Sequence, residues 1–308
     1  MKIAVIGSGA MGLLFGARLG MSGNEVTMID VIPAVIEKIN KDGIHLEADD
    51  GDFTIPIKAC TASDMTEHVE LAILFTKTIY SRPALENSNS YMGPDTHMLT
   101  MQNGLGNIEL INEFLPLERI IAGVTTFSGD IKGPGHTISH GTGYLRIMSA
   151  DGRKTEVLET ICRVLSNAGL SAEIVPDVMV AIWEKVAFNA AINATSAICH
   201  VPCGGMGACA EGEELIYKIS DEACMVASAY GVAVNAESVR ATLKRTLSVH
   251  KDHFTSMGQD VIAKRKTEND FICGGIMKMA KAKGLSVPNN EAMYAILKVV
   301  ENTYDMSK

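Results

Sequence analysis

The chain has 308 residues, of which 47% are hydrophobic and 20% are charged. This length accommodates about two ordinary domains, each able to bury its own core, and the composition does not indicate disorder. A formal net charge of −9 argues against a nucleic-acid partner and against binding to an anionic membrane surface. We therefore expect a soluble protein that binds a small molecule.

The cysteines and the N-terminus indicate the compartment. Seven cysteines without a paired framework are typical of a reducing environment. Cys199, His200, Cys203 and Cys209 resemble metal-ligand spacing, but no second pair completes the usual set of four zinc ligands. We expect thiols there, and no metal. Three early glycines interrupt the N-terminal apolar segment before it reaches the length of a membrane span. We therefore expect a cytoplasmic protein without a membrane anchor.

The N-terminal residues predict a strand, a glycine-rich turn, a helix and a second strand. These elements span Lys2–Ile6, 7–12, Leu13–Met21 and Glu25–Ile29. The second strand is closed by Asp30, which follows the last glycine of the turn by 18 residues (30 − 12). A G-x-G-x-x-G turn in this context is the fingerprint of a dinucleotide-binding unit.

Each glycine of the turn has a physical role in that interpretation. The six residues of the fingerprint are Gly7, Ser8, Gly9, Ala10, Met11 and Gly12. The first glycine permits a tight turn, the second lets the backbone approach a pyrophosphate, and the third lets helix and strand pack closely. The N-terminus of the following helix then faces the negative charge of the phosphates.

Strands and helices continue to alternate along the first half of the chain. Further strands are predicted at Leu71–Thr76, His97–Gln102, Ile120–Phe127 and Ser171–Val175, with a hairpin over Ile44–Ile57 that turns at 50–52 and short strands within Ser128–Met148. Helices are predicted at Ile32–Asn40, Arg82–Ser90, Asn107–Leu115 and Lys154–Ala168. This alternation predicts an α/β Rossmann-type domain with a mainly parallel sheet, whose ligand binds at the carboxyl ends of the strands.

Two polar residues follow strands of this sheet directly. Lys77 and Asn103 each come immediately after a predicted strand, where they could line a ligand. An ordinary loop lysine and a plain Asn-Gly turn explain the same positions equally well.

From residue 177 onward the pattern is helical. A long helix follows Asp177, and further helices are predicted at Glu213–Tyr230, Ala236–Ser248, Gln259–Lys283 and Glu291–Met306. We therefore divide the chain into a dinucleotide-binding domain, residues 1–176, and an all-α C-terminal domain for substrate binding and catalysis, residues 177–308.

The long helix carries three polar residues on one stripe. Lys185, Asn189 and Asn193 recur every four residues in a segment otherwise rich in Ala, Ile, Val and Phe. Burying a lysine and two carboxamides costs several kcal/mol unless they find partners. The stripe is either an active-site face that holds an anionic ligand or a network that satisfies itself inside the core.

Several motifs, taken in order, resemble the ketopantoate reductase (2-dehydropantoate 2-reductase) family from end to end. Besides the glycine turn and the stripe, the landmarks are Thr76-Lys77, 102–106, 123–126, 183–185, 256–260 and 266–268. The resemblance implies reduction of the keto group of 2-dehydropantoate to pantoate in pantothenate and coenzyme A biosynthesis. Hydride would come from a nicotinamide cofactor, and a homodimer would be compatible with this activity.

The resemblance also implies roles for individual residues. Lys185 would be the proton donor, and Asn189, Asn193 and Ser256 would hold the substrate. The cofactor would be lined by Lys77, Asn103, Gly129 and Glu268, of which Asn103 and Glu268 would also lie near the reacting carbon, as a substrate contact and a catalytic residue.

Three positions have another interpretation or depart from the family. Ser256 and Gln259 form an S-x-x-Q capping box, which is a structural alternative to substrate binding. Glu268 follows three basic residues and by pattern alone indicates an exposed salt-bridging face. Cys203 stands where some members of the family have an asparagine that contacts the substrate.

Asp30 bears on the choice of cofactor. A carboxylate at the end of the second strand can accept hydrogen bonds from the ribose hydroxyls of NAD(H), and it would repel the 2′-phosphate of NADP(H). The next four residues are neutral, so we expect a preference for NAD(H), with NADP(H) as the alternative if Asp30 caps the following helix and Lys38 or Lys41 covers a phosphate.

Two other functions remain open at this point. A D-2-hydroxyacid dehydrogenase for other branched or aromatic 2-oxo acids would share the fold and the chemistry. A non-catalytic dinucleotide sensor would share the fold, but it would have no need for a proton donor at Lys185.

Overall fold

The computed structural model describes residues 1–306. Its contacts divide the chain into two compact units. The α/β unit contains Met1–Gln102 and Asn107–Val178, and the helical unit contains Asn103–Gly106 and the chain from Met179 onward. The predicted fold class is confirmed: an N-terminal α/β unit with a mostly parallel sheet precedes a helical C-terminal unit. The domain boundary at 176/177 stays a prediction.

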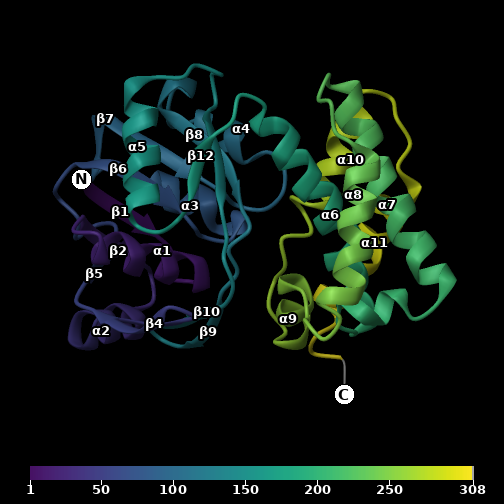
Figure 1. The fold of residues 1–308 in the computed structure, drawn as a ribbon, viewed down its shortest axis with the longest axis horizontal. Coiled ribbons are helices and arrows are strands. Elements are labelled where there is room, and N and C mark those ends of the chain that lie inside the picture. Colours follow the sequence, from purple (N-terminus) through teal and green to yellow (C-terminus); the bar gives the residue numbers. More distant parts are fainter. Residues whose placement is uncertain (307–308) are drawn as a thin grey trace. The chain divides into compact units, whose positions relative to one another are not determined.

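The main sheet of the α/β unit has eight strands in the order β12-β11-β8-β7-β6-β1-β2-β5 (Figure 1). Neighbouring strands run parallel except for β11 and β8. Their bounds are β1 Lys2–Ile6, β2 Glu25–Ile29, β5 Lys58–Cys60, β6 Val69–Leu74, β7 Met92–Thr100, β8 Ile120–Thr125, β11 Leu145–Ser149 and β12 Ala172–Ile174. All residues of β8 are buried, as in a parallel sheet covered on both faces.

Helices of this unit follow the predicted alternation with shifted ends. They are α1 Ala10–Met21, α2 Pro33–Asp42, α3 Ser81–Glu86, α4 Asn107–Asn112 and α5 Glu156–Asn167, with short 3₁₀ turns η1 Thr78–Tyr80 and η2 Leu117–Arg119. Strand β5 was not predicted, because its three residues include no β-branched or aromatic side chain.

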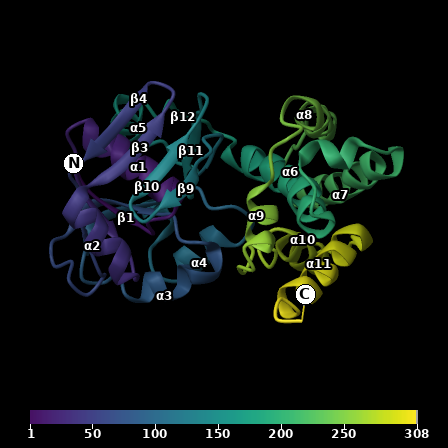
Figure 2. The same ribbon diagram turned by 90° about the horizontal axis from the view of Figure 1, so that it is seen from below.

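A second, smaller sheet has the order β4-β3-β10-β9 (Figure 2). Its strands are β3 Ile44–Ala48, β4 Gly51–Ile55, β9 Asp130–Gly133 and β10 His136–Ser139. The predicted hairpin is present as β3 and β4, although it turns at residues 49–50. Helix α1 lies between the two sheets, because a Cβ added at Gly16 would meet Met28 of β2 at 2.6 Å and Ile44 of β3 at 3.3 Å.

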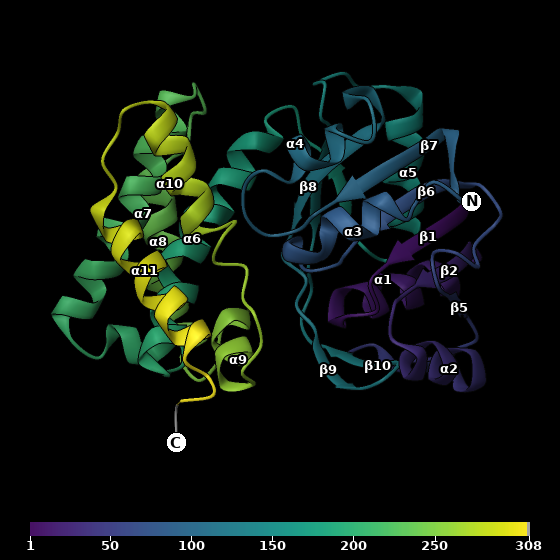
Figure 3. The same cartoon turned by 180° about the vertical axis from the view of Figure 1, so that it is seen from behind.

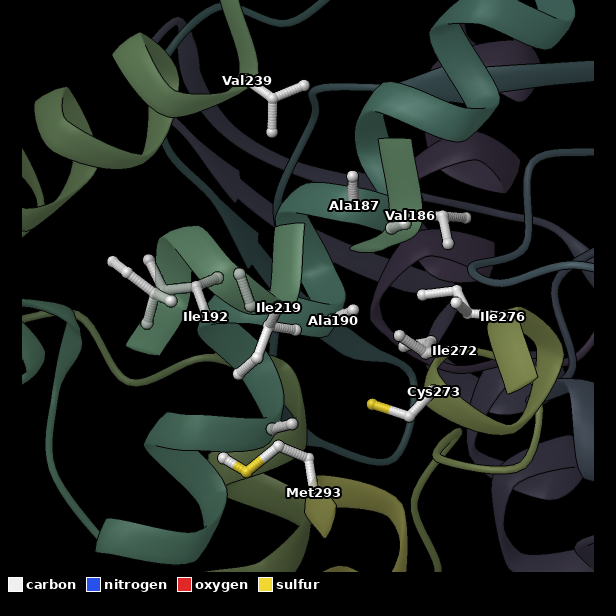
Figure 4. Packing of buried hydrophobic residues seen from close by; sticks show 14 of the residues in the cluster. Val186, Ala187, Ala190, Ile192, Ile219, Val239, Ile272, Cys273, Ile276 and Met293 are labelled. Atoms are coloured by element: carbon white, nitrogen blue, oxygen red, sulfur yellow. The ribbon is translucent and has the colours of Figure 1, made fainter. Parts of the chain in front are cut away.

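The helical unit packs around α6, a helix of 22 residues (Figure 3). Its helices are α6 Val178–Cys199, α7 Ala210–Ala229, α8 Ala236–Val249, α9 Ser256–Ile262, α10 Cys273–Ala282 and α11 Pro288–Asn302, with the 3₁₀ turn η3 Cys203–Gly207. Small buried side chains on α6, among them Ala187 and Ala190, join a core with Ile219, Ile272 and Ile276 (Figure 4). Small side chains such as alanine allow neighbouring helices to pack closely.

The single helix predicted over Gln259–Lys283 is wrong. The segment forms two helices, α9 and α10, separated by residues 263–272. Lys264 has a positive φ of 53°, and the buried carboxylate of Glu301 accepts hydrogen bonds from the Thr267 amide and hydroxyl at 2.7 and 2.6 Å. Tertiary hydrogen bonds therefore override local helix propensity in the segment that carries Glu268.

None of the helices within residues 1–306 is long and apolar enough to span a bilayer.

Candidate active site

The glycine turn lies at the carboxyl end of β1, as predicted. Gly7 has a φ of +100°, and its amide donates to the carbonyl of Ile29 at 2.8 Å. A Cβ added at Gly12 would lie only 1.9 Å from the carbonyl oxygen of Gly7. Gly12 is therefore fixed by the contact between the helix and the turn, whereas a Cβ at Gly9 would meet nothing within 4 Å.

The start of α1 fits the pyrophosphate of a dinucleotide. Gly9 is the N-cap residue, it makes no side-chain cap, and the first turn carries no acidic residue. The hydroxyl of Ser8 is buried and has no hydrogen-bond partner among residues 1–306. Uncapped amides at a helix N-terminus attract anions, and a buried hydroxyl without a partner calls for a ligand. The residues present therefore fit the group that the fingerprint implies.

Asp30 is fixed beside this turn. One carboxylate oxygen accepts the Ser8 amide at 2.7 Å, and the other accepts the amides of Val31 and Ile32 at 2.8 and 3.0 Å. The carboxylate thus binds backbone amides of both the glycine turn and the two residues that precede α2. It remains directed toward the glycine turn. Lys38 pairs with Asp42 on its own helix at 2.7 Å.

Two further predicted cofactor residues lie near the same turn. A Cβ added at Gly7 would lie 2.9 Å from the amide nitrogen of Thr76, the residue that precedes Lys77. A Cβ added at Gly129 would lie 3.6 Å from the Cβ of Ala10, at the start of α1. The fold of the α/β unit therefore brings the fingerprint, Asp30, Lys77 and Gly129 to the carboxyl ends of the strands of the main sheet.

Within the helical unit, polar side chains from three segments form a network. The Asn189 carboxamide donates to the side-chain oxygen of Asn103 at 3.3 Å, and the Asn103 carboxamide donates to the carboxylate of Glu268 at 3.0 Å. The segment that carries Asn103 is anchored here, since the Leu105 amide donates to the carbonyl of Phe271 at 2.8 Å. Residues predicted from separate motifs are thus joined in one chain of hydrogen bonds.

Lys185 lies on α6 one turn before Asn189 and interacts electrostatically with Glu268. Burial lowers the pKa of Lys185 from its ordinary value to about 8, and the negative charge of Glu268 opposes that shift. A group with this pKa is still mainly protonated at neutral pH, but it releases its proton far more readily than an exposed lysine. It can therefore serve as a general acid.

Asn193 and Ser256 lie further along α6 and at the start of α9. The Asn193 side chain is 6% exposed. A Cβ added at Gly258 would lie 3.0 Å from the hydroxyl of Ser196, so α9 packs against α6 close to Asn193. A carboxamide can both donate hydrogen bonds to a ligand and accept them from it.

The capping alternative for Ser256 is wrong. Thr255 is the N-cap of α9, and its hydroxyl accepts the Gly258 amide at 3.1 Å. Ser256 is the first helical residue and its side chain is exposed. Its hydroxyl is therefore not engaged in the cap.

Cys203 packs within the core of the helical unit. The side chain is 2% exposed, burial raises the pKa of its thiol, and its amide donates to the carbonyl of His253 at 2.9 Å. Cys199 and Cys209 are exposed. Within residues 1–306, none of these three cysteines belongs to a cluster of His, Cys, Asp and Glu side chains close enough together to hold a metal ion.

Sequence reasoning missed Glu301, whose carboxylate holds Thr267 next to Glu268. The two segments are 34 residues apart in the sequence, and Glu301 lies in a regular helix. No local signal could have identified it.

Comparison with known proteins agrees with this geometry. The family described as "Ketopantoate reductase PanE/ApbA" matches residues 3–152, and its C-terminal part matches residues 177–301. A 2-dehydropantoate 2-reductase of Pyrococcus horikoshii is 32% identical over 308 residues and is covered completely, as is this chain. One of Streptococcus pyogenes is 29% identical over 289 residues, with 94% of each chain covered.

Solved structures are similar over the same length. D-mandelate dehydrogenase with NADH and anilino(oxo)acetate superposes with a TM-score of 0.95 at 28% identity, covering 99% of this chain and 100% of that one. A PanE/ApbA family ketopantoate reductase from Ralstonia eutropha superposes with a TM-score of 0.91 at 26% identity, covering 98% and 99%.

Proposed function

This chain belongs to the ketopantoate reductase PanE/ApbA family, and on that premise we propose that it reduces 2-dehydropantoate to pantoate. The proposed setting is pantothenate and coenzyme A biosynthesis in the cytoplasm. Relatives named 2-dehydropantoate 2-reductase at 29% and 32% identity over nearly the whole chain support the substrate. The observation that carries the proposal is Lys185, which shares α6 with Asn189 and whose pKa is lowered by burial to about 8, against the opposing charge of Glu268.

The chemistry assigns each part a task. A bound reduced nicotinamide supplies the hydride that forms the new C–H bond at the carbonyl carbon. Negative charge then develops on the carbonyl oxygen, and the Lys185 ammonium stabilises this charge and donates the proton that completes the hydroxyl group. Glu268 keeps the lysine protonated, because its charge opposes the loss of the proton.

The amides orient the substrate without adding charge. Asn193, a buried residue of α6, can donate to the substrate carboxylate or hydroxyl. Asn189 is bound to Asn103, which in turn is bound to Glu268, so a change at one of these residues alters the position of the next. Ser256 adds a hydroxyl at the start of α9.

A substrate panel tests the proposal. Purified protein, with NADH and with NADPH, is assayed for loss of cofactor absorbance with 2-dehydropantoate, phenylglyoxylate and aliphatic branched 2-oxo acids. We expect 2-dehydropantoate to have the highest kcat/KM. If another 2-oxo acid is preferred by about a hundredfold, equal to ~2.7 kcal/mol in transition-state stabilisation, the proposed substrate is wrong.

A D-2-hydroxyacid dehydrogenase is the second candidate. Two observations favour it: the likeness to D-mandelate dehydrogenase at a TM-score of 0.95, and a buried thiol at Cys203 in place of a polar contact. In that case phenylglyoxylate gives the highest kcat/KM. If cofactor binds but no 2-oxo acid is turned over, the sensor is the remaining function.

For the cofactor we propose a preference for NADH of roughly tenfold or more in kcat/KM, because the Asp30 carboxylate would repel a 2′-phosphate. Its position against the Ser8 amide supports this, and so does the pairing of Lys38 with Asp42. Asp30→Ala should reduce or reverse the ratio. Asp30→Asn removes the charge but keeps one of the two acceptor oxygens, so it loses fewer hydrogen bonds than Asp30→Ala.

The control is Asp95→Ala, which removes an exposed carboxylate from β7. It should leave the ratio of NADH to NADPH unchanged. A wild-type enzyme that prefers NADPH would refute this role for Asp30 without affecting the role of Lys185.

A further inference from the structure

The outer face of the small sheet carries histidines and carboxylates outside the candidate active site. Along β3, Ile44 and Leu46 are fully buried, while His45 and Glu47 are only partly buried. Side chains alternate between the two faces of a strand, so His45 and Glu47 share the face opposite to α1. Their neighbours across the sheet are His136 of β10, in register with His45, and Asp52 of β4, in register with Glu47.

The two imidazoles lie directly against each other. Their ring centroids are 4.0 Å apart, and the planes differ by 20°. Each ring also contacts a carboxylate through Nε2: His45 lies 2.5 Å from Asp52, and His136 lies 2.7 Å from Glu47. Four potential ligands therefore come from three adjacent strands.

We propose that His45, Glu47 and His136 bind a divalent transition-metal ion, for which Zn²⁺ is the best match. One donor atom of each residue lies within 4.8 Å of the others. Zinc prefers imidazole nitrogen and carboxylate oxygen at bond lengths of about 2.0–2.2 Å, so a small movement of these side chains brings the donors to coordination distance. Asp52, already in contact with His45, is placed to be the fourth ligand.

The site is open to an ion from solvent. The side chains of the three residues are between 27% and 38% exposed, and a hollow of about 290 Å³ adjoins both imidazoles. Metal ions bind imidazole and carboxylate ligands in their deprotonated forms, so zinc binding should become stronger as the pH rises.

The ion would join segments that are distant in the sequence. It would tie the β3–β4 hairpin, residues 44–55, to β10, residues 136–139. Strand β10 reaches the start of α1, where the Thr137 hydroxyl donates to the carbonyl of Ala10 at 3.3 Å. We therefore expect metal binding to raise the melting temperature of the protein.

Calorimetric titration of the tag-free protein with ZnCl₂, together with thermal unfolding, tests this site. The wild-type protein should bind one equivalent and melt at a higher temperature when zinc is present. His136→Gln and His45→Gln should each weaken binding by at least roughly tenfold and abolish the increase in melting temperature. Glu47→Gln provides a variant that preserves size and hydrogen bonding if either histidine variant fails to fold.

Two variants serve as controls. His140→Gln removes another imidazole–carboxylate contact, with Asp49 at 2.7 Å, which lies outside the triad. Cys199→Ser removes an exposed thiol that could bind zinc. Both should bind zinc like the wild type. The proposal is overturned if the wild type binds no zinc below about 100 µM, or if His136→Gln and His45→Gln bind it as tightly as the wild type.

Discussion

The two units of this protein build their proposed ligand-binding groups from different parts of the chain. In the α/β unit the groups are mainly backbone: the amides at the start of α1, a turn shaped by glycines, and the Ser8 hydroxyl. In the helical unit they are side chains from three segments, Lys185 and Asn189 of α6, Asn103, and Glu268. The first kind of site depends on the absence of side chains, whereas the second depends on the position of each side chain.

This difference predicts how each site fails. A backbone site is lost when an added atom has no room, and the loss appears in binding and stability. A side-chain site is lost when one functional group is removed, and the loss appears in the chemical step while the fold persists.

The largest effect is expected for Lys185→Ala. Loss of the proposed proton donor should lower kcat by about 10²–10⁴, with little change in cofactor binding. Stopped-flow or steady-state assays measure kcat, and fluorescence titration measures cofactor affinity. Lys278→Ala, which removes an exposed lysine from α10, is the matched control and should retain full activity. Near-normal kcat in a folded Lys185→Ala variant would refute the mechanism.

A pair of glycine variants tests the backbone site. Gly12→Ala places a Cβ 1.9 Å from the Gly7 carbonyl oxygen, so it should destabilise the fold by about 1–3 kcal/mol and weaken cofactor binding. Gly9→Ala places a Cβ where no protein atom lies within 4 Å. It should therefore leave thermal unfolding nearly unchanged and weaken only cofactor binding. Equal melting temperatures for the two variants would show that the contact between Gly12 and the Gly7 carbonyl does not determine the stability of the fold.

The pH dependence distinguishes the side-chain site further. Reduction needs protonated Lys185, so kcat should fall above an apparent pKa of about 8. Glu268→Gln removes the charge that opposes the shift, so the fall should begin at lower pH. Initial rates from pH 6 to 10 measure both profiles, to be compared with that of Glu291→Gln, which changes a carboxylate in the first turn of α11. If kcat of Glu268→Gln instead fell at a higher pH than kcat of the wild type, the expected sign of the Glu268 effect would be wrong.

The same lysine affects stability with a definite sign. Its pKa in the folded state is lower than the ordinary value of 10.5 in the unfolded chain. The unfolded state therefore binds more protons between these values, and the contribution of Lys185 to the free energy of unfolding rises with pH from about 8 to 10.5. In Lys185→Ala this rise should be absent, which urea unfolding at a series of pH values can measure.

The sequence was most informative where the structure is local. β1, β2, the glycine turn and Asp30 follow from periodicity and spacing, since each depends on near neighbours in the chain. The loop over residues 263–272 could not be predicted, because a buried carboxylate 34 residues beyond Thr267 holds it. Likewise, the parallel pairing of β3 with β10 places His45 beside His136 across 91 residues, and no local pattern encodes that register.

The segment Asn103–Gly106 has a consequence for recombination between relatives. These four residues group with the helical unit, although the chain on both sides of them belongs to the α/β unit. Leu105 is 7% exposed within the helical core, and Gly104 has a φ of +91° with no room for a Cβ beside Phe271. A chimera that exchanges only the C-terminal half would pack residues 103–106 of one parent against the helical unit of the other parent. Functional hybrids within the family should therefore inherit residues 103–106 and the helical half from the same parent.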